Sequence, residues 1–157
     1  MSLASEDNEN MADIRIVVDR LIEEAHELLS DTLAATKDID NRHKQQGVDW
    51  TRRHRLHVLV EAAEDSRARL PQLVVAPWFL AELRTTLNVV RRWRDKPSWR
   101  EIEPSLKVGH QFAHTILKLH LADHLEASGH KVQVVPRRPI RSPDLQFRAI
   151  GGSEELV

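Results

Sequence analysis

The chain has 157 residues, of which 41% are hydrophobic and 30% are charged, and it contains no cysteine. This composition is typical of a globular protein, and the length allows one domain or a helical region with a small appendage. The lack of cysteine excludes disulfides, zinc–thiolate sites and cysteine nucleophiles. The longest apolar run, residues 73–81, contains Pro77 and is shorter than the roughly 20 residues that a membrane span needs. We expect a cytoplasmic protein with no membrane partner.

Charge is distributed unevenly along the chain, although the formal net charge is only −1. Residues 1–50 carry 12 acidic and 5 basic residues, whereas residues 51–100 carry 5 acidic and 11 basic residues. Residues 101–157 carry 7 of each. The basic middle segment can attract phosphate groups, and it can equally attract the acidic first segment of its own chain.

The first half of the chain is predicted to be helical after a disordered tail over residues 1–10. A first helix is predicted from Asp13 to about Thr36, because apolar residues recur there at intervals of three and four. The polar residues 37–49 are predicted to form a loop. A second helix is predicted over residues 50–69, with an inward-facing stripe of four apolar side chains: Leu56, Leu59, Val60 and Ala63.

Prolines and glycines mark the ends of the next two helices. Pro77 suits the first turn of a third helix, which is predicted to stop by Asp95. Ser98, with Glu101 three residues later, fits a capping box at the start of another helix. Pro104 kinks or restarts that helix, which is predicted to run over residues 105–127. Gly129 fits the left-handed residue that follows a helix.

After Gly129 the apolar period changes from that of a helix to that of a strand. Residues 131–135 and 144–150 alternate between apolar and polar side chains, and residues 154–157 are able to begin another strand. The predicted fold is therefore mainly α, with four to five helices and a short C-terminal β-hairpin, and α+β overall. We expect a helical region over residues 11–100 and a helix with β-strands over residues 101–157.

The last third of the chain resembles a known enzyme superfamily. The resemblance lies in the order Gly109-x-x-Phe112, Leu121-x-x-x-Leu125-x-x-x-Gly129-x-x-Val132 and Ser142-Pro143-Asp144-Leu145-x-Phe147. This order is similar to the opening of the PD-(D/E)xK, or restriction-endonuclease-like, nucleases. There a helix leads through a glycine into a first strand, a Pro-Asp pair opens a second strand, and a third strand carries Glu/Asp-x-Lys.

The resemblance implies a metal-dependent cleavage of DNA with Asp144 as catalytic and metal-binding residue. Phosphodiester cleavage needs a cation such as Mg²⁺, held by carboxylate oxygens. Glu155 is followed by no lysine, so the Glu-x-Lys motif is missing and the resemblance is to a nuclease core truncated before it. We expect Mg²⁺ only in a complete parent protein, where an endonuclease activity would reside. A turn residue, bound to nearby backbone N–H groups, is the alternative role of Asp144.

Two basic clusters are candidate DNA contacts. The first interleaves cations with Trp93 and Trp99, and arginines bind phosphates while indoles stack on bases. The alternative is a helix end whose cations suit the helix dipole and whose indoles cover the core. The second cluster precedes Pro143 in a predicted loop. The nucleic-acid-binding candidates are Arg91, Arg92, Arg94, Lys96, Arg100, Arg137, Arg138 and Arg141.

Histidines form the last candidate site, on the predicted helix over residues 105–127. His110 and His114 are four residues apart, the spacing that lets two imidazoles reach one metal ion. The usual zinc-protease motif has a glutamate after its first histidine, where Gln111 stands here. The alternative places the histidines at the edge of a packed interface beside Leu117 and Leu121.

Two functions follow from these patterns. The first is a DNA-directed protein, a truncated nuclease-like core behind a helical N-terminal region. The second is a non-catalytic helical module for protein–protein interaction. In that case the apolar stripe that begins at Ile14, or the C-terminal strands, would form a homodimer.

Overall fold

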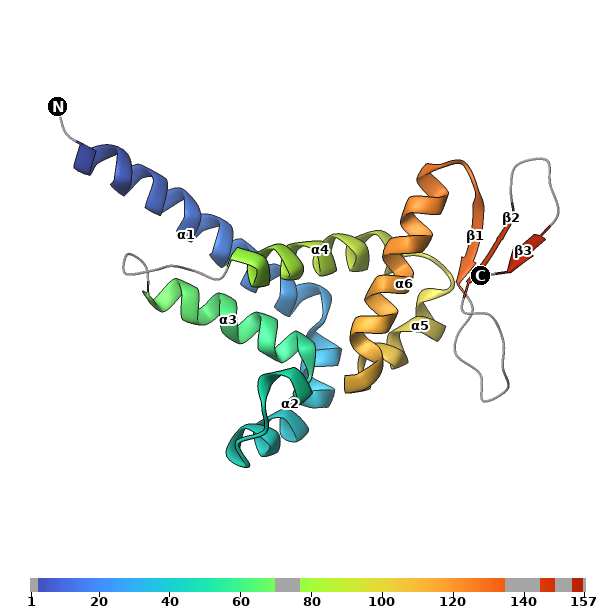
Figure 1. Ribbon diagram of the computed structural model, residues 1–157, viewed down its shortest axis with the longest axis horizontal. Helices are drawn as coiled ribbons and strands as arrows, with labels where there is room; N and C mark the ends of the chain where they lie inside the picture. Colours follow the sequence, from blue (N-terminus) through green and yellow to red (C-terminus); the bar gives the residue numbers. More distant parts are fainter. Residues whose placement is uncertain (1–2, 70–76, 135–144, 149–153, 157) are drawn as a thin grey trace. The chain divides into compact units, whose positions relative to one another are not determined.

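The computed structural model describes residues 3–69, 77–134, 145–148 and 154–156. Within these ranges the chain is predominantly helical, as predicted (Figure 1). None of the described helices is long and apolar enough to cross a membrane. The elements in chain order are α1 (Leu3–Leu28), α2 (Ser30–Gln45), the short 3₁₀ helix η1 (Trp50–Arg52), α3 (Arg55–Arg69), α4 (Pro77–Trp93), α5 (Trp99–Leu106), α6 (Gly109–Ala127), β1 (Lys131–Val134), β2 (Leu145–Arg148) and β3 (Glu154–Leu156).

The chain divides into two compact units, Met1–Leu87 and Asn88–Val157, which we call unit 1 and unit 2. The sequence suggested a boundary between residues 100 and 101. The observed boundary lies earlier, inside α4, which begins at Pro77 as predicted. The difference arises because the last turns of α4 supply core residues to unit 2, as described below.

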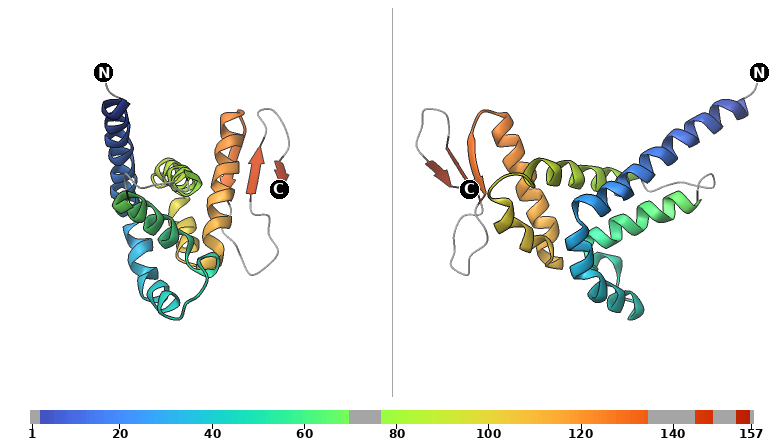
Figure 2. Two further views of the ribbon diagram at one scale, coloured as in Figure 1. Left: turned by 60° about the vertical axis from the view of Figure 1, so that its left-hand side comes forward. Right: turned by 180° about the vertical axis from the view of Figure 1, so that it is seen from behind.

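Unit 1 is built on the packing of α1 against α3. The two helices lie side by side in Figures 1 and 2. The predicted stripe of α1 is largely buried at Val18, Leu21 and Ala25, whereas Ile14 is 45% exposed. The helix begins at Leu3, inside the segment for which a disordered tail was predicted. Adding a residue to an existing helix costs far less than nucleating one, so a helix can extend beyond its apolar stripe.

The structure corrects the prediction of a loop over residues 37–49. Helix α2 continues to Gln45, and Gly47 adopts a φ of 66° just after it. The inner face of α2 is mostly polar, because Thr32, Thr36 and Asp40 are buried there together with a single leucine. A helix with a polar inner face gives no hydrophobic periodicity, and so this half of α2 was missed. The predicted single helix to Thr36 is in fact two, separated at Leu29.

Unit 2 is built from the end of α4, the helices α5 and α6, and the strands. Its core joins Val89, Trp93, Ile102, Leu119, Ala122 and Val134, with Trp99 and Val132 packed against it. The predicted helix over residues 105–127 is two helices, separated at Lys107 and Val108. Ser98 precedes α5, but its side chain makes no capping hydrogen bond, so the predicted capping box is not formed. The count of four to five helices was accordingly too low.

Helix α6 ends at Ala127, and Gly129 follows it with the predicted left-handed conformation, at a φ of 89°. The N–H of His130 donates to the carbonyl of Leu125 and the N–H of Gly129 to that of Glu126, which is the hydrogen-bond pattern of a Schellman motif. This turn leads directly into β1, which lies along α6 (Figure 1). The C-terminal strands form an antiparallel sheet in the order β1-β2-β3, in place of the single hairpin that was predicted.

Candidate functional site

The two tryptophans of the predicted DNA-binding cluster have structural roles in unit 2. Trp93 is 1% exposed and lies in the core, and its Nε1 donates a hydrogen bond of 3.1 Å to Oδ1 of Asp123. Lys96 places its ammonium nitrogen 3.6 Å from the centroid of the Trp93 ring. Trp99 is partly buried against the same core. Trp93 is therefore buried and unavailable for stacking on a base, and Trp99 is only partly accessible.

Three of the five predicted cations of this cluster are also bound within unit 2. Arg92 forms an ion pair of 2.8 Å with Asp123, and Lys96 forms one of 2.6 Å with Glu126. Arg91 donates a hydrogen bond to the side chain of Asn88, one turn earlier on α4. Arg94 and Arg100 are exposed, and neither forms an ion pair with another described residue. These two arginines are the described members of the cluster that remain available for phosphate.

The candidate residues of the C-terminal loop, Asp144 with Arg137, Arg138 and Arg141, lie outside the described residues. Their roles stay predictions. The flanking elements are described: β1 ends at Val134, and β2 begins at Leu145, directly after Asp144. Strand β3 pairs with β2 in the antiparallel register Phe147 to Glu155 and Arg148 to Glu154.

Both histidines of the predicted pair on α6, His110 and His114, are exposed. Among the described side chains, no three histidine or carboxylate groups come close enough together to hold a metal ion. Metal binding by this pair therefore stays a prediction. Leu117 is 67% exposed and Leu121 is 41% exposed, so the packed interface proposed as the alternative is not formed within the described part of this chain.

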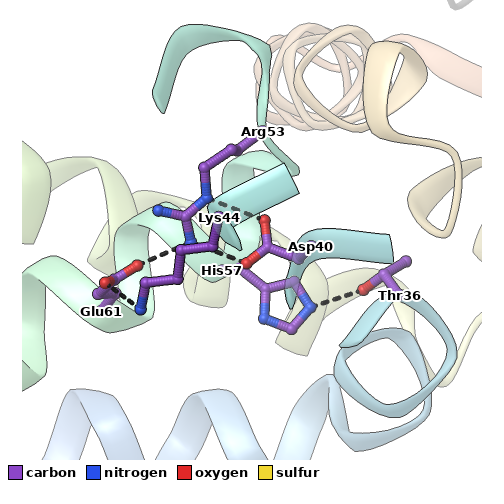
Figure 3. Close-up of polar contacts among 6 residues, drawn as sticks. All are labelled: Thr36, Asp40, Lys44, Arg53, His57 and Glu61. Carbon is purple, nitrogen blue, oxygen red and sulfur yellow. Dashed lines mark hydrogen bonds and ion pairs between the residues drawn. The ribbon is translucent and has the colours of Figure 1, made fainter. Parts of the chain in front are cut away.

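A network of charged residues in unit 1 was not predicted from the sequence (Figure 3). Arg53, which follows η1, points toward α2 and donates to both carboxylate oxygens of Asp40, at 3.2 and 2.7 Å. It also pairs with Glu61 of α3 at 2.7 Å, and Glu61 in turn pairs with Lys44 of α2. The side chains of Arg53 and Asp40 are only 10% and 5% exposed. The network thus joins α2, the segment after η1, and α3.

The hydrogen bonds and charges within the network shift the pKa of each of its carboxyl groups. Burial by itself would raise the pKa of Asp40, but the hydrogen bonds and charge of Arg53 outweigh it, and the pKa is lowered. Glu61 behaves in the same way, with Lys44 and Arg53 lowering its pKa against the effect of burial. Hydrogen bonding to Asp40 raises the pKa of Arg53. All three groups are therefore charged at neutral pH.

His57 borders this network and is held in one tautomer. The hydroxyl of Thr36 donates to the carbonyl of Thr32 at 2.7 Å, so its oxygen accepts a hydrogen bond from Nε2 of His57 at 2.8 Å. Burial lowers the pKa of His57, although the charge of Asp40 opposes this shift. At neutral pH the ring is uncharged, with its proton on Nε2 and a lone pair on Nδ1.

A pocket of about 420 Å³ opens beside the network. Its charged lining residues are three cations and three anions, so it has no net charge to recruit an ion. Arg53 and Asp40 are bound to one another, so the network stabilises the packing of the helices that it joins. The lining residues are His26, Ser30, Leu33, Ala34, Lys37, Asp40, Asn41, Lys44, Arg53, His57, Val60, Glu61 and Glu64.

The comparisons with known proteins give no relative. No family model matches the sequence, no curated protein matches it, and no solved structure matches the fold.

Proposed function

We propose that this protein binds nucleic acid through unit 2, and that α6 and the strands after it are the opening of a nuclease-like core. The order of the helix and strands at the end of unit 2 is the observation that supports the proposal. Helix α6 is followed by a left-handed glycine, Gly129, and then by β1. Strand β2 begins directly after Pro143-Asp144, and β3 pairs with β2. This is the order that the resemblance to the PD-(D/E)xK nucleases requires.

The distribution of charge between the units also supports nucleic-acid binding. Unit 2 contains 12 basic and 8 acidic residues, whereas unit 1 contains 11 basic and 16 acidic residues. The net charge therefore favours unit 2 over unit 1 as the unit that binds a duplex. Arg94 and Arg100 would contact phosphates from the exposed surface at the end of α4 and the start of α5. The loop arginines Arg137, Arg138 and Arg141 would extend this contact beside Asp144.

The proposal concerns binding and not cleavage by this chain. In a nuclease-like site Asp144 would supply one carboxylate to Mg²⁺, which polarises the phosphate. One carboxylate does not hold Mg²⁺, which also needs further oxygen ligands. The sequence has no lysine after Lys131, so the lysine of the Glu-x-Lys motif is not among its residues.

Binding of a fluorescein-labelled DNA duplex, followed by fluorescence anisotropy, tests the proposal. We expect saturable binding that does not require Mg²⁺ and persists in EDTA, because the phosphate contacts are made by arginines. A duplex that fails to bind at low salt would refute the proposal.

A second function, homotypic interaction, is favoured by one observation. Among the described helices, α1 and α6 each carry more than one exposed large apolar side chain: Ile14, Ile16 and Val17 on α1, and Leu117 and Leu121 on α6. Such side chains are common at helix–helix interfaces between chains. Sedimentation velocity at micromolar concentration separates the two functions. A stable dimer that does not bind DNA would favour the second, and a monomer that binds DNA would favour the first.

A further inference from the structure

Three aromatic side chains gather around one guanidinium on the surface of unit 1. Trp50 of η1 lies with its ring centroid 6.1 Å from that of Trp78 and 5.8 Å from that of Phe79, at the start of α4. The guanidinium carbon of Arg55 lies over all three rings, between 5.4 and 5.7 Å from each centroid. Trp50 is 44% exposed and Trp78 is 48% exposed, so both indoles reach the solvent.

The guanidinium at the centre of the cluster is held by an ion pair. Glu82 of α4 accepts two hydrogen bonds from Arg55, one from Nε at 2.7 Å and one from a terminal nitrogen. This bidentate pair holds the guanidinium plane, and the guanidinium in turn contacts the rings through cation–π interactions. A rigid aromatic surface loses little side-chain entropy when it binds a planar ligand. The geometry is thus that of a preorganised stacking platform.

The charges near the platform distinguish it from the rest of unit 1. Of the 16 acidic residues in unit 1, 11 fall between Glu6 and Asp40, on α1 and α2. Glu82 is neutralised by Arg55, and the carboxylate of Asp49 is engaged by the N–H and hydroxyl of Thr51. Arg52, two residues after Trp50, is exposed. The platform therefore combines aromatic faces with an exposed cation.

We propose that unit 1 binds single-stranded nucleic acid by stacking unpaired bases on Trp50 and Trp78, with Arg52 contacting the phosphate backbone. Unpaired bases suit these rings because every base offers a planar π face, whereas the bases of a duplex are already stacked. The class of ligand rests on the proposed function of unit 2, but the residues are different ones. A proline-containing peptide also binds between aromatic rings, and it is the other outcome that the test must separate.

The test measures affinity for a fluorescein-labelled oligothymidylate of about 12 nucleotides, a length within the site size of known single-strand-binding folds. The full chain is compared with the double variant Trp50→Ala/Trp78→Ala. We expect the variant to lose at least about tenfold in affinity for the single strand, since stacking on one aromatic side chain is worth roughly that factor per base. Binding of the duplex should not change, because it depends on unit 2.

Two further variants make the result specific. Trp50→Phe/Trp78→Phe keeps aromatic rings at both positions and should retain most of the affinity, which separates lost stacking from a folding defect. Arg94→Ser/Arg100→Ser should weaken the duplex more than the single strand. Single-strand affinity that survives Trp50→Ala/Trp78→Ala, with duplex binding intact, would refute the platform and leave the proposed function standing.

The remaining outcomes are equally decisive. If neither the duplex nor the single strand binds, both proposals fail. If a fluorescein-labelled polyproline peptide binds to the full chain but not to the alanine variant, while oligothymidylate does not bind, the platform recognises a peptide and the nucleic-acid proposal for unit 1 is wrong.

Discussion

Arg53 holds the carboxylate of Asp40 with two hydrogen bonds, of 3.2 and 2.7 Å, and both side chains are almost completely withdrawn from solvent. Removing Asp40 leaves the buried guanidinium of Arg53 with one anionic partner, Glu61, in place of two. We therefore expect Asp40→Ala to lower the free energy of unfolding by about 3 kcal/mol. Urea unfolding followed by circular dichroism measures this loss.

A matched control comes from the exposed end of the same network. Lys44 pairs with Glu61, but its side chain is 53% exposed. Exposed ion pairs contribute little, so Lys44→Ala should cost less than about 1 kcal/mol. Equal losses in the two variants would show that the buried pair is not the central contact of the network.

The lowered pKa of His57 predicts a dependence of stability on pH. In the unfolded chain the imidazole takes up a proton near its ordinary pKa of about 6.5, whereas the folded chain resists protonation to a lower pH. Stability from this group is therefore complete above about pH 6.5 and falls as the pH is lowered below that value.

The variant His57→Gln isolates this effect from the eight other histidines. Unfolding free energies measured from neutral pH down to the range where carboxyl groups titrate should decline less steeply for the variant than for the parent chain. Identical slopes would mean that His57 titrates normally. The lowered pKa values of Asp40 and Glu61 act in a separate window, because their stabilisation is lost only as the pH falls below the ordinary carboxyl range.

Asp123 is expected to stabilise unit 2 through its contact with Trp93. In Asp123→Ala the indole N–H is left buried without its acceptor, at a cost of about 1–3 kcal/mol. Asp123→Asn keeps an oxygen for the indole and loses only the ion pair with Arg92, whose side chain is 67% exposed, so it should cost less than about 1 kcal/mol. Urea unfolding followed by tryptophan emission compares the variants. A larger loss in the asparagine variant would contradict this role.

Sequence patterns predicted the parts of the fold in which the buried face is apolar. The inward stripe of α3, including Leu56 and Leu59, is buried as expected, and Gly129 ends α6 with the expected left-handed φ. The second half of α2 was missed because Thr36 and Asp40 occupy its inner face. A polar face of this kind is stabilised by partners distant in sequence, here His57 and Arg53, which no local periodicity reveals.

The candidate sites were likewise predicted where their residues are close in the sequence, and their distant partners were missed. The tryptophans and arginines at residues 91–100 form a clear local cluster, but the sequence could not show that Asp123 and Glu126, some 30 residues later, engage three of its members. The aromatic platform was missed because Trp50 and Trp78 are far apart in the sequence and are joined through Arg55. The signals that were present are two isolated tryptophans in polar or proline-flanked surroundings.

Arg94 and Arg100, which form no ion pair with another described residue, are expected to contact phosphate. Arg94→Ser/Arg100→Ser should weaken duplex binding to a similar extent for unrelated sequences, because phosphate contacts carry no base information. It should also reduce the slope of log affinity against log salt by about two, one for each lost contact. Arg69→Ser is the control, since Arg69 is an exposed arginine in unit 1. An equal effect of Arg69→Ser would mean that overall charge, and not this surface, governs binding.

The salt dependence of duplex binding by the unaltered chain shows whether this protein binds DNA through phosphate contacts. Affinity measured by fluorescence anisotropy between about 50 and about 200 mM salt should fall linearly with log salt, since each phosphate contact releases a counterion. We predict a slope that corresponds to several contacts, at least those of Arg94 and Arg100. An affinity that does not change over this range, or the absence of binding at the lowest salt, would contradict the account.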